Sequence, residues 1–517
     1  MGEFTILVLL KGEGDMVGFS SGVSAIATHS ASDQTEYLFG EGVSSVSVPS
    51  RRAEIFGNSS SSSASVSISS DAFDLIGMVQ SGLVLTGVTC EIRYFSEGDY
   101  WVEAPLLFSG VATSAEIDSY DGAVNISFGP NYSLANMEFP SSRVGDKGRF
   151  DNAPESTFGR VLPVVYGQVQ RYPIPAVNFD YNIAGGGEVD VCVAAHPIYG
   201  SVDKPGHIQI GNNRLGDMNT WYEVMSGVDG LGGTYSYITV DLEDWDDGIY
   251  ATSVSGKTST DGRRMESLGD IALDLWMSYS GSPETTFDAG RSRYASERLN
   301  RFSVGMAFTD SSKNQTVVDI MSGRLGDLPL DFSSPIGLFG WDASIVPDPD
   351  CEISGKLHYG INIVSRETVA FGGYGAIQNR FKISFNYDNN NEGNTGSFII
   401  DQSNSALCAE SVSRYGESQY VELSAPDVVT PLSVGHFASC EIMKRAFPRL
   451  GLRYFTDDPS FISAPLLSVY EVTDEEIGVN SGHFFLEAVT PDINNGGCLI
   501  ELRSIRSLER AFIRSQS

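Results

Sequence analysis

The segment Gly18-Phe19-Ser20-Ser21-Gly22 matches the G-x-S-x-G pattern, in which a strained serine acts as a nucleophile. That chemistry needs the serine on a sharp turn between a strand and a helix, with its hydroxyl exposed above an oxyanion hole. The residues that follow, Val23 to Thr28, have the composition of a strand. In a chain with 55 glycines and many serines the pattern also arises by chance. We therefore predict no catalytic serine here.

Two acidic segments have side chains that a hard cation could use. Asp388 to Gly393 carries oxygen side chains at positions 1, 3 and 5 and glycine at position 6, as in a calcium-binding loop. Its position 12 is Ile399, where a calcium loop has a bidentate glutamate, so the segment predicts a polar β-turn. Asp241 to Asp247 packs five carboxylates into seven residues. A solvated acidic loop is the favoured interpretation, and cation binding there stays open.

The histidines and cysteines show no spacing typical of a metal site or of a Cys/His nucleophile. The six histidines are His29, His196, His207, His358, His436 and His483. The six cysteines, predicted to be buried thiols of a protein folded in a reducing cytosol, are Cys90, Cys192, Cys351, Cys408, Cys440 and Cys498. We predict no catalytic, cofactor-binding or metal-binding residues and no enzyme activity, although 66 acidic residues leave a glycosidase pair of carboxylates open.

Composition favours a β-rich protein that does not bind nucleic acid tightly. The 517 residues predict three or four domains, and glycine, serine, threonine and valine favour short strands and turns. Acidic residues exceed basic ones by 66 to 33, a net charge of −33 that repels phosphate. Such a surface is compatible with a conduit through which nucleic acid slides, and equally with adaptation to a salty environment.

One segment occurs twice, at an offset of 360 residues. Arg93-Tyr94-Phe95, eight residues and Ala104-Pro105-Leu106-Leu107 return as Arg453-Tyr454-Phe455, eight residues and Ala464-Pro465-Leu466-Leu467. Thr113, Glu116 and Ile117 continue the match, giving 10 identities in 25 positions, where composition alone gives roughly one or two. Each copy has the pattern of strand, acidic turn and strand, which predicts a β-hairpin in each of two related domains.

The remaining pattern predicts a mainly β fold with two related domains, each a β-barrel or β-sandwich, and an inserted β-rich (α+β) middle region. The predicted domains are a first such domain at 1–150, an inserted β-rich domain at 151–300, a connecting α+β domain at 301–374 and a second such domain at 375–517. Phe4 to Leu10 is apolar but too short to span a membrane, and predicts a first strand. Apolar residues at helical spacing predict helices around 265–276, 317–325 and 434–447, and a short helix or disorder over 503–514.

Three features together resemble the tail hub, or tail-tip, proteins of tailed bacteriophages and gene transfer agents. The first is the duplicated segment. The second is the strand start Pro163 to Gly167 followed by Val191 to Ile198, which resembles the opening of the inserted domain of such hubs. The third is an order of segments that resembles their second barrel, namely 381–398, 413–416, 426–428, the helix with Ala438, Arg453-Tyr454 and 472–478.

The resemblance implies that the domains at 1–150 and 375–517 are two related tube-like β-barrels. It also implies a structural protein of the virion, assembled in the host cytoplasm. A trimer of chains with two tube-like barrels each would form a pseudo-hexameric ring that ends the tail tube and adapts six-fold to three-fold symmetry. It would let DNA pass during ejection, and host attachment would involve neighbouring subunits. The implied partners are the distal tail or tail tube ring, the tape measure protein and fibre subunits, with no cofactor, no specific nucleic-acid binding and no membrane span.

Two other functional classes stay open from the sequence. One is a virion-associated depolymerase that hydrolyses polysaccharide, although neither a long parallel β-helix repeat nor a catalytic module is visible. The other is a polysaccharide-binding adhesin.

Overall fold

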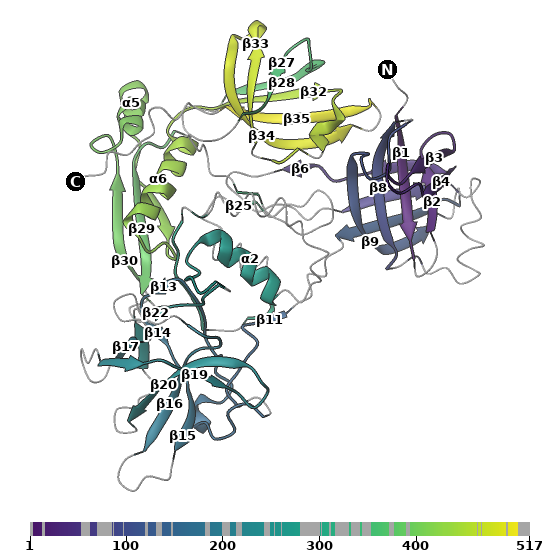
Figure 1. Cartoon of the computed structure of the whole chain (residues 1–517). Coiled ribbons are helices and arrows are strands. Elements are labelled where there is room, and N and C mark those ends of the chain that lie inside the picture. The colour runs from purple at the N-terminus through teal and green to yellow at the C-terminus, as the bar shows by residue number, and fades with distance from the viewer. Residues whose placement is uncertain are drawn as a thin grey trace.

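A computed structural model describes the chain from residue 4 to residue 504, apart from 13–15, 53–62, 70–84, 86, 97, 119–121, 131–136, 146–147, 181–186, 199–206, 213–219, 242–248, 253, 260, 280–299, 301, 310–311, 316–329, 332–341, 344–352, 372–376, 389–392, 463, 467 and 493–494. The described part is mainly β, as predicted, and contains several separate sheets (Figure 1). No helix within it is long and apolar enough to cross a membrane.

The first 130 residues form a nine-stranded sheet in the order β3-β4-β2-β1-β8-β9-β10-β7-β5. Its strands are β1 (Phe4–Lys11), β2 (Met16–Ser20), β3 (Ala25–Thr28), β4 (Glu36–Glu41), β5 (Val43–Ser47), β7 (Ala64–Ile68), β8 (Thr89–Ser96), β9 (Leu106–Ile117) and β10 (Val124–Pro130). The predicted first strand is confirmed as β1. Its apolar run is continuous because both faces are buried, Ile6 and Val8 in one core and Leu7 and Leu9 in another.

A single residue joins the two ends of this sheet. Gly42 is the only residue between β4, near one edge, and β5, the opposite edge. Its N–H donates to the Ser20 carbonyl oxygen at the end of β2 (3.1 Å), and its carbonyl oxygen accepts from the Ser69 N–H after β7 (2.8 Å). The sheet therefore curls until its ends meet, although the strand ladder itself is not continuous all the way round.

A second large sheet is built mainly from the last part of the chain. Its order is β27-β33-β34-β35-β32-β28, and β6 from the first domain pairs with β34. The strands are β27 (Ile353–His358), β28 (Ser365–Phe371), β32 (Leu450–Thr456), β33 (Val469–Asp474), β34 (Val479–Asp492), β35 (Gly497–Ser504) and β6 (Arg51–Arg52). Two of them, β27 and β28, come from the segment predicted to be a connecting domain. The division into four domains stays a prediction.

The ends of the second sheet also meet. Edge strands β27 and β28 are linked by only six residues, 359–364. The Tyr359 N–H donates to the Thr473 carbonyl oxygen on β33 (3.0 Å), and the Val364 N–H donates to the Phe455 carbonyl oxygen on β32 (2.9 Å). Both large sheets thus bring their ends together through a short connection. Closed tube-like barrels and the superposition of the two domains stay predictions.

The repeated segment is a hairpin in the first copy only. Strands β8 and β9 pair directly, with Arg93 opposite Leu106. In the second copy β32 pairs with β28 and β35, while β33 pairs with β27 and β34. The prediction of a hairpin there is wrong, because the two strands that follow the repeat in the chain insert between β32 and β33.

The two copies share a pattern of burial. Each buries a tyrosine on its first strand, Tyr94 or Tyr454, and an aromatic ring in the following turn, Trp101 or Phe461. The Trp101 ring stacks on Phe39 (5.2 Å between centroids), and the Phe461 ring packs against Tyr470 (5.3 Å). The repeat therefore preserves a strand followed by a turn that carries a buried aromatic ring.

The repeated prolines avoid paired strand interiors, as predicted from their missing N–H. Pro105 immediately precedes β9, and its carbonyl oxygen accepts from the Tyr94 N–H (2.9 Å). Pro465 lies in the turn before β33, where its carbonyl oxygen accepts from the Ser468 hydroxyl (2.6 Å). Neither proline therefore lies inside a paired strand, and Pro465 lies further from its strand than Pro105 does.

A smaller sheet with two helices is inserted between β28 and β32. Its order is β30-β29-β31, from β29 (Phe381–Asp388), β30 (Gly393–Ile400) and β31 (Val421–Ala425). Helix α6 (Pro431–Arg445) confirms the predicted third helix. It begins with a Thr430 hydroxyl that accepts from the Ser433 N–H and with proline at its first position. Helix α5 (Ala406–Tyr415), which begins with Ser405 as its cap, was not predicted.

The middle region combines two four-stranded sheets, β15-β16-β20-β19 and β14-β21-β17-β18, with helix α2 (Leu268–Tyr279). Helix α2 confirms the helix predicted around 265–276, while the one predicted at 317–325 lies outside the described residues. Elements of this region are β11 (Met137–Phe139), η1 (Glu155–Thr157), β12 (Val164–Tyr166), β13 (Gln168–Val169), β14 (Tyr172–Pro173), β15 (Ala176–Asp180), β16 (Glu188–Ala194), β17 (His207–Asn212), β18 (Thr220–Glu223), β19 (Met225–Val228), β20 (Thr234–Asp241), β21 (Ile249–Thr252), β22 (Val254–Ser255), β23 (Met306–Phe308), β24 (Ser312–Gln315), β25 (Leu330–Asp331) and β26 (Asp342–Ala343).

The buried turn aromatic of the first copy provides a test of the N-terminal core. We expect Trp101→Ala to lower the free energy of unfolding of this sheet by about 3–5 kcal/mol, because a large buried ring leaves a cavity. The neighbouring side chain of Val102 is exposed, so Val102→Ala should change it by no more than about 0.5 kcal/mol. Urea unfolding followed by circular dichroism measures both. Equal midpoints for the two variants would show that the Trp101 ring does not support the sheet.

Candidate functional site

The serine of the G-x-S-x-G segment is placed where it cannot act as a nucleophile. Ser20 ends β2 and is fully buried. Its hydroxyl donates to main-chain carbonyl oxygens, with Val23 at 2.9 Å. The next element is strand β3 and not a helix. This geometry differs from a nucleophile elbow, in which an exposed serine lies between a strand and a helix.

The acidic segments fall largely outside the described residues. Residues 242–248 and 389–392 are not described, and the flanking Asp241 and Asp388 end strands β20 and β29. Asp388 is buried and forms a parallel backbone bridge with Gln170 of the middle region. Among the described residues, no three His, Cys, Asp or Glu side chains are grouped so that they could hold a metal ion.

The described cysteines and the buried His196 have structural environments. Cys90, Cys192, Cys408, Cys440 and Cys498 are buried thiols, and Cys351 lies outside the described residues. The His196 Nε2 atom accepts a hydrogen bond from the Val165 N–H (3.0 Å). Burial lowers the pKa of His196 to about 4, so its ring is neutral and keeps this acceptor at neutral pH.

The side chains that matter most for the architecture lie at joints between elements distant in the sequence. The first joint lies at what we call the seam of the second sheet, where β28 at one edge meets the end of β33 near the other edge. Arg366 on β28 makes two hydrogen bonds to the Asp474 carboxylate at the end of β33 (2.6 and 2.9 Å). The Tyr454 hydroxyl on β32 donates to the same carboxylate (2.8 Å). Three strands near the two edges of the sheet therefore converge on one carboxylate.

The Asp474 carboxylate is shielded from water, which strengthens this joint. Its side chain is 0% exposed, and the Arg366 guanidinium also lies 4.4 Å from the centre of the Tyr359 ring in the β27–β28 connection. Burial and the hydrogen bond to Asp474 raise the pKa of Tyr454 above its ordinary value, so the phenol stays a neutral donor. A buried carboxylate with three such hydrogen bonds fixes the seam geometry.

The second joint connects the first domain to the second large sheet. Strand β6 pairs with β34 through Arg51 opposite Val489 and Arg52 opposite Ala488. The Arg51 guanidinium is buried and donates to the Ile462 carbonyl oxygen (2.7 Å), while Arg52 forms an ion pair with Glu501 on β35. Figure 1 shows β6 reaching from the N-terminal domain to this sheet. The two large sheets are therefore attached by main-chain pairing and by two arginine side chains.

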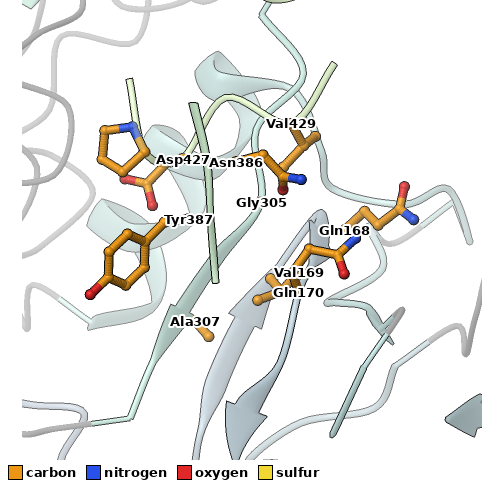
Figure 2. A pocket seen from close by; sticks show the side chains of 10 residues that line it. Gln168, Val169, Gln170, Gly305, Ala307, Asn386, Tyr387, Asp427 and Val429 are labelled. Carbon is orange, nitrogen blue, oxygen red and sulfur yellow. The ribbon is translucent and has the colours of Figure 1, made fainter. Parts of the chain in front are cut away.

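The third joint fastens the middle region to the inserted small sheet, and Figure 2 shows the residues around it. The Gly305 N–H donates to the Asp427 carbonyl oxygen (2.8 Å), and the Asn386 N–H donates to the Val428 carbonyl oxygen (3.0 Å). Val304 and Val428 form an antiparallel bridge. Three segments thus meet backbone to backbone around a hollow too small for a substrate, about 10 Å³.

Glycine is required at this joint for a steric reason. A Cβ atom on Gly305 would lie 1.8 Å from the Gln168 carbonyl oxygen, and one on Gly167 would lie 1.9 Å from the Val304 carbonyl oxygen. Both distances are far inside van der Waals contact, so the two chain segments approach as closely as their backbones permit.

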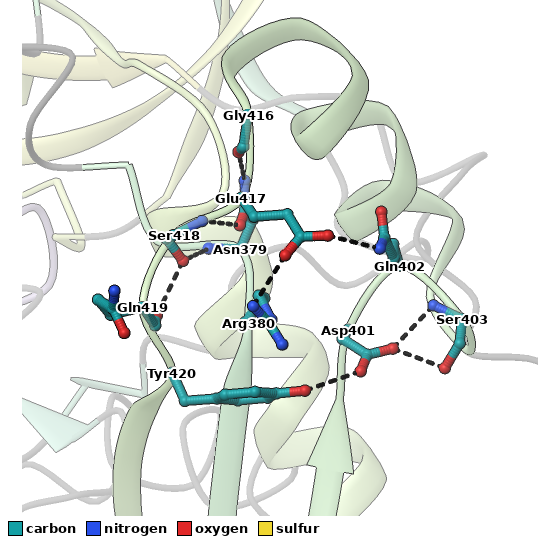
Figure 3. Close-up of polar contacts among 10 residues, drawn as sticks. All are labelled: Asn379, Arg380, Asp401, Gln402, Ser403, Gly416, Glu417, Ser418, Gln419 and Tyr420. Carbon is teal, nitrogen blue, oxygen red and sulfur yellow. Dashed lines mark hydrogen bonds and ion pairs between the residues drawn. The ribbon is translucent and has the colours of Figure 1, made fainter.

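Polar side chains fix helix α5 against the small sheet (Figure 3). Arg380 pairs with Glu417 (2.9 Å) and lies over the Tyr420 ring (4.0 Å). The Tyr420 hydroxyl donates to Asp401 (3.0 Å), and Gln402 donates to Glu417 (2.8 Å). This network joins the end of β30, the start of α5 and the approach to β31.

Helix α2 is attached to the middle region by a further set of charges. The Tyr166 hydroxyl donates to Asp274 (2.6 Å), and the Lys257 ammonium pairs with the same carboxylate (2.7 Å). Burial and the Asp274 carboxylate raise the pKa of Tyr166, so it too stays a neutral donor. The Asp474 and Asp274 carboxylates are thus each held by a basic side chain and a tyrosine hydroxyl, which suits attachment of distant elements.

Three solved tail proteins align along nearly the whole chain. The tail protein from Neisseria meningitidis MC58 is 9% identical, with a TM-score of 0.41 over 98% of both chains. The 43 kDa tail protein of prophage MuSo2 from Shewanella oneidensis is 10% identical, with a TM-score of 0.37 over 97% of this chain and 98% of its own. A prophage tail protein from Listeria monocytogenes EGD-e is 8% identical, with a TM-score of 0.39 over 96% of this chain and 94% of its own.

No known family model and no curated protein matches the sequence. The TM-scores of the aligned tail proteins lie below 0.5, so the alignments carry no inference about function.

We expect neutralisation of the Asp474 carboxylate to destabilise the second large sheet. Asp474→Asn removes the charge opposite Arg366, and we expect the second sheet to lose about 2–3 kcal/mol. The expected loss of stability is smaller than the usual cost of breaking a fully buried ion pair, because part of the Arg366 side chain is exposed. The matched control is Glu476→Gln. Glu476 also contacts Arg366 (3.2 Å) but is 65% exposed, so its loss should cost less than about 1 kcal/mol. Urea midpoints that shift equally for both variants would contradict the proposed seam.

The backbone joint predicts that Gly305→Ala loosens the middle region. We expect a loss of about 1–3 kcal/mol, since the added methyl forces Gln168 and Gly305 apart. Limited proteolysis should cleave near residues 168–170 faster than in the unsubstituted chain. Gly435→Ala in α6 is the control, because a Cβ there meets open space and should stabilise the helix by about 0.5–1 kcal/mol. Unchanged proteolysis of Gly305→Ala would show that the close approach is unimportant.

Proposed function

We propose that the chain is a structural hub protein of a phage tail tip, which assembles as a trimer into a ring that ends the tail tube. The observation that carries this proposal is the presence of two large sheets in one chain, each with its ends brought together by a short connection. The joint of β6 with β34 holds these two sheets to each other. A single chain can therefore contribute two neighbouring β units to one ring.

The symmetry argument follows from the number of such units. Three chains with two large sheets each present six β units, so a trimer can meet a six-fold tube ring while its other domains occur only three times. The different strand orders around the repeated segment make this match approximate. The six positions would be alike in shape and size, and not in topology.

The charge balance supports passage of DNA through such a ring. With 66 acidic residues against 33 basic ones, an exposed lumen wall would be neutral to acidic. A basic wall would bind the phosphate backbone by releasing counterions and would slow ejection. An acidic wall repels phosphate and keeps the duplex centred in water.

The partners of the proposed ring are other virion proteins. The distal tail or tail tube ring would stack on one side, the tape measure protein would end within it, and other tail-tip or fibre subunits would bind below. The joints between distant elements support a structural role for the chain. Host-cell recognition would be shared with those subunits.

This function predicts that the chain forms a trimer and does not bind DNA. In native mass measurements the purified chain should be a trimer of about three times its 55.8 kDa mass. Fluorescence anisotropy with a labelled duplex should detect no binding even at low salt, where electrostatic binding is strongest.

Either half of this expectation can fail separately. Tight, salt-sensitive DNA binding would exclude a passive conduit. A chain that stays monomeric both in solution and in isolated tail particles would exclude the ring. Hydrolysis of host polysaccharide by the purified chain would favour a depolymerase instead.

A further inference from the structure

The outer corner of the N-terminal sheet carries an exposed apolar surface. It consists of Val23, Ile26 and Leu38, which are 76%, 60% and 69% exposed, and we call it the corner patch. Ile26 on β3 lies directly opposite Leu38 on β4, so their side chains are neighbours on one face. Figure 1 shows β3 and β4 on the side of this domain that faces away from the rest of the chain.

The second large sheet carries a different apolar projection. The connection between β27 and β28 presents Ile361 and Val364, which are 81% and 55% exposed, and we call these two residues the turn knob. The turn is fixed from within. The His358 N–H donates to the Asn362 side-chain oxygen (2.7 Å), and the Asn362 amide donates to the Lys356 carbonyl oxygen (2.8 Å). A rigid apolar side chain loses little conformational entropy on binding, which is typical of interface anchors.

We infer that the turn knob of one copy docks on the corner patch of the next copy, and that this contact builds the ring. The inference rests on the proposed function, because a closed three-fold ring requires a head-to-tail interface in which each copy uses two different surfaces. The corner patch and the turn knob lie in different domains of the chain. Both are exposed within their own chain, so neither covers the other intramolecularly.

Charge favours this pairing of surfaces. Copies that each carry −33 repel one another, so a contact between them should be apolar or should place a base against an acid. Glu36 lies two residues before Leu38 on β4 and is exposed on the same face as the corner patch. Lys356, whose side chain is 64% exposed and pairs with Glu471 (2.9 Å), lies on β27 close to the turn knob. Docking would bring this lysine toward the exposed carboxylate beside the patch.

Cross-linking between two variants of the full chain, each with one added cysteine, tests the contact directly. Leu38→Cys and Ile361→Cys chains are mixed, and a short bismaleimide is added. The five described native cysteines are buried, and the unsubstituted chain measures any reaction of native thiols. We expect covalent dimers from this mixture but not from Val228→Cys mixed with Ile361→Cys, since Val228 is equally exposed on β19 of the middle region.

A charge substitution gives an independent measurement. Leu38→Glu should raise the concentration needed for half-maximal trimer formation by at least about tenfold, because it places a carboxylate in the centre of an apolar contact. Val228→Glu should leave that concentration unchanged. Both residues are exposed, so thermal unfolding of both variants should match that of the unsubstituted chain.

The possible results separate this inference from the proposed function. A trimer that forms normally with Leu38→Glu and gives no specific cross-link overturns the docking contact and leaves the ring intact. An unsubstituted chain that does not assemble at all overturns both.

Discussion

The architecture depends on one constraint, which is that each large sheet must bring its two ends together through a very short stretch of chain. Gly42 does so in the N-terminal sheet and residues 359–364 do so in the second. Open sheet edges expose unpaired N–H and C=O groups, which favour aggregation. Short connections place the two ends of each sheet close together, although its edge strands are not paired with each other. The Arg366–Asp474 ion pair then fixes the seam of the second sheet at a carboxylate that water does not reach.

The remaining elements attach to these two units. Strand β6 joins the sheets to each other, and the hydrogen bond from the Gly305 N–H to the Asp427 carbonyl oxygen joins the middle region to the inserted small sheet. The first two joints add side-chain contacts to main-chain bonds, whereas the third is made by the backbone. Ser20, His196 and the described cysteines are buried in the cores. A chain built this way is suited to hold fixed geometry between neighbours in an assembly.

Local patterns in the sequence predict where individual strands and helices lie, but they do not predict which strands pair with each other. The apolar run at 4–10 predicts β1 because both of its faces are buried, and the spacing of apolar residues predicts α2 and α6. The ten-residue helix α5 was missed because its short apolar stripe is interrupted by serines. The prediction of a hairpin at 453–467 is wrong because β32 pairs with β28 and β35, which lie earlier and later in the chain, and not with β33. Joints such as Arg366–Asp474, 108 residues apart, leave no local signal at all.

In the proposed ring, three chains supply six similar β units around one channel. Electron cryomicroscopy of the assembled tail tip, viewed along its axis, would show this arrangement. We expect a layer in which the sheets of residues 4–130 and 353–504 alternate around an open channel with three-fold symmetry. A layer that contains only one of the two sheets from each chain, or a closed centre, would contradict it.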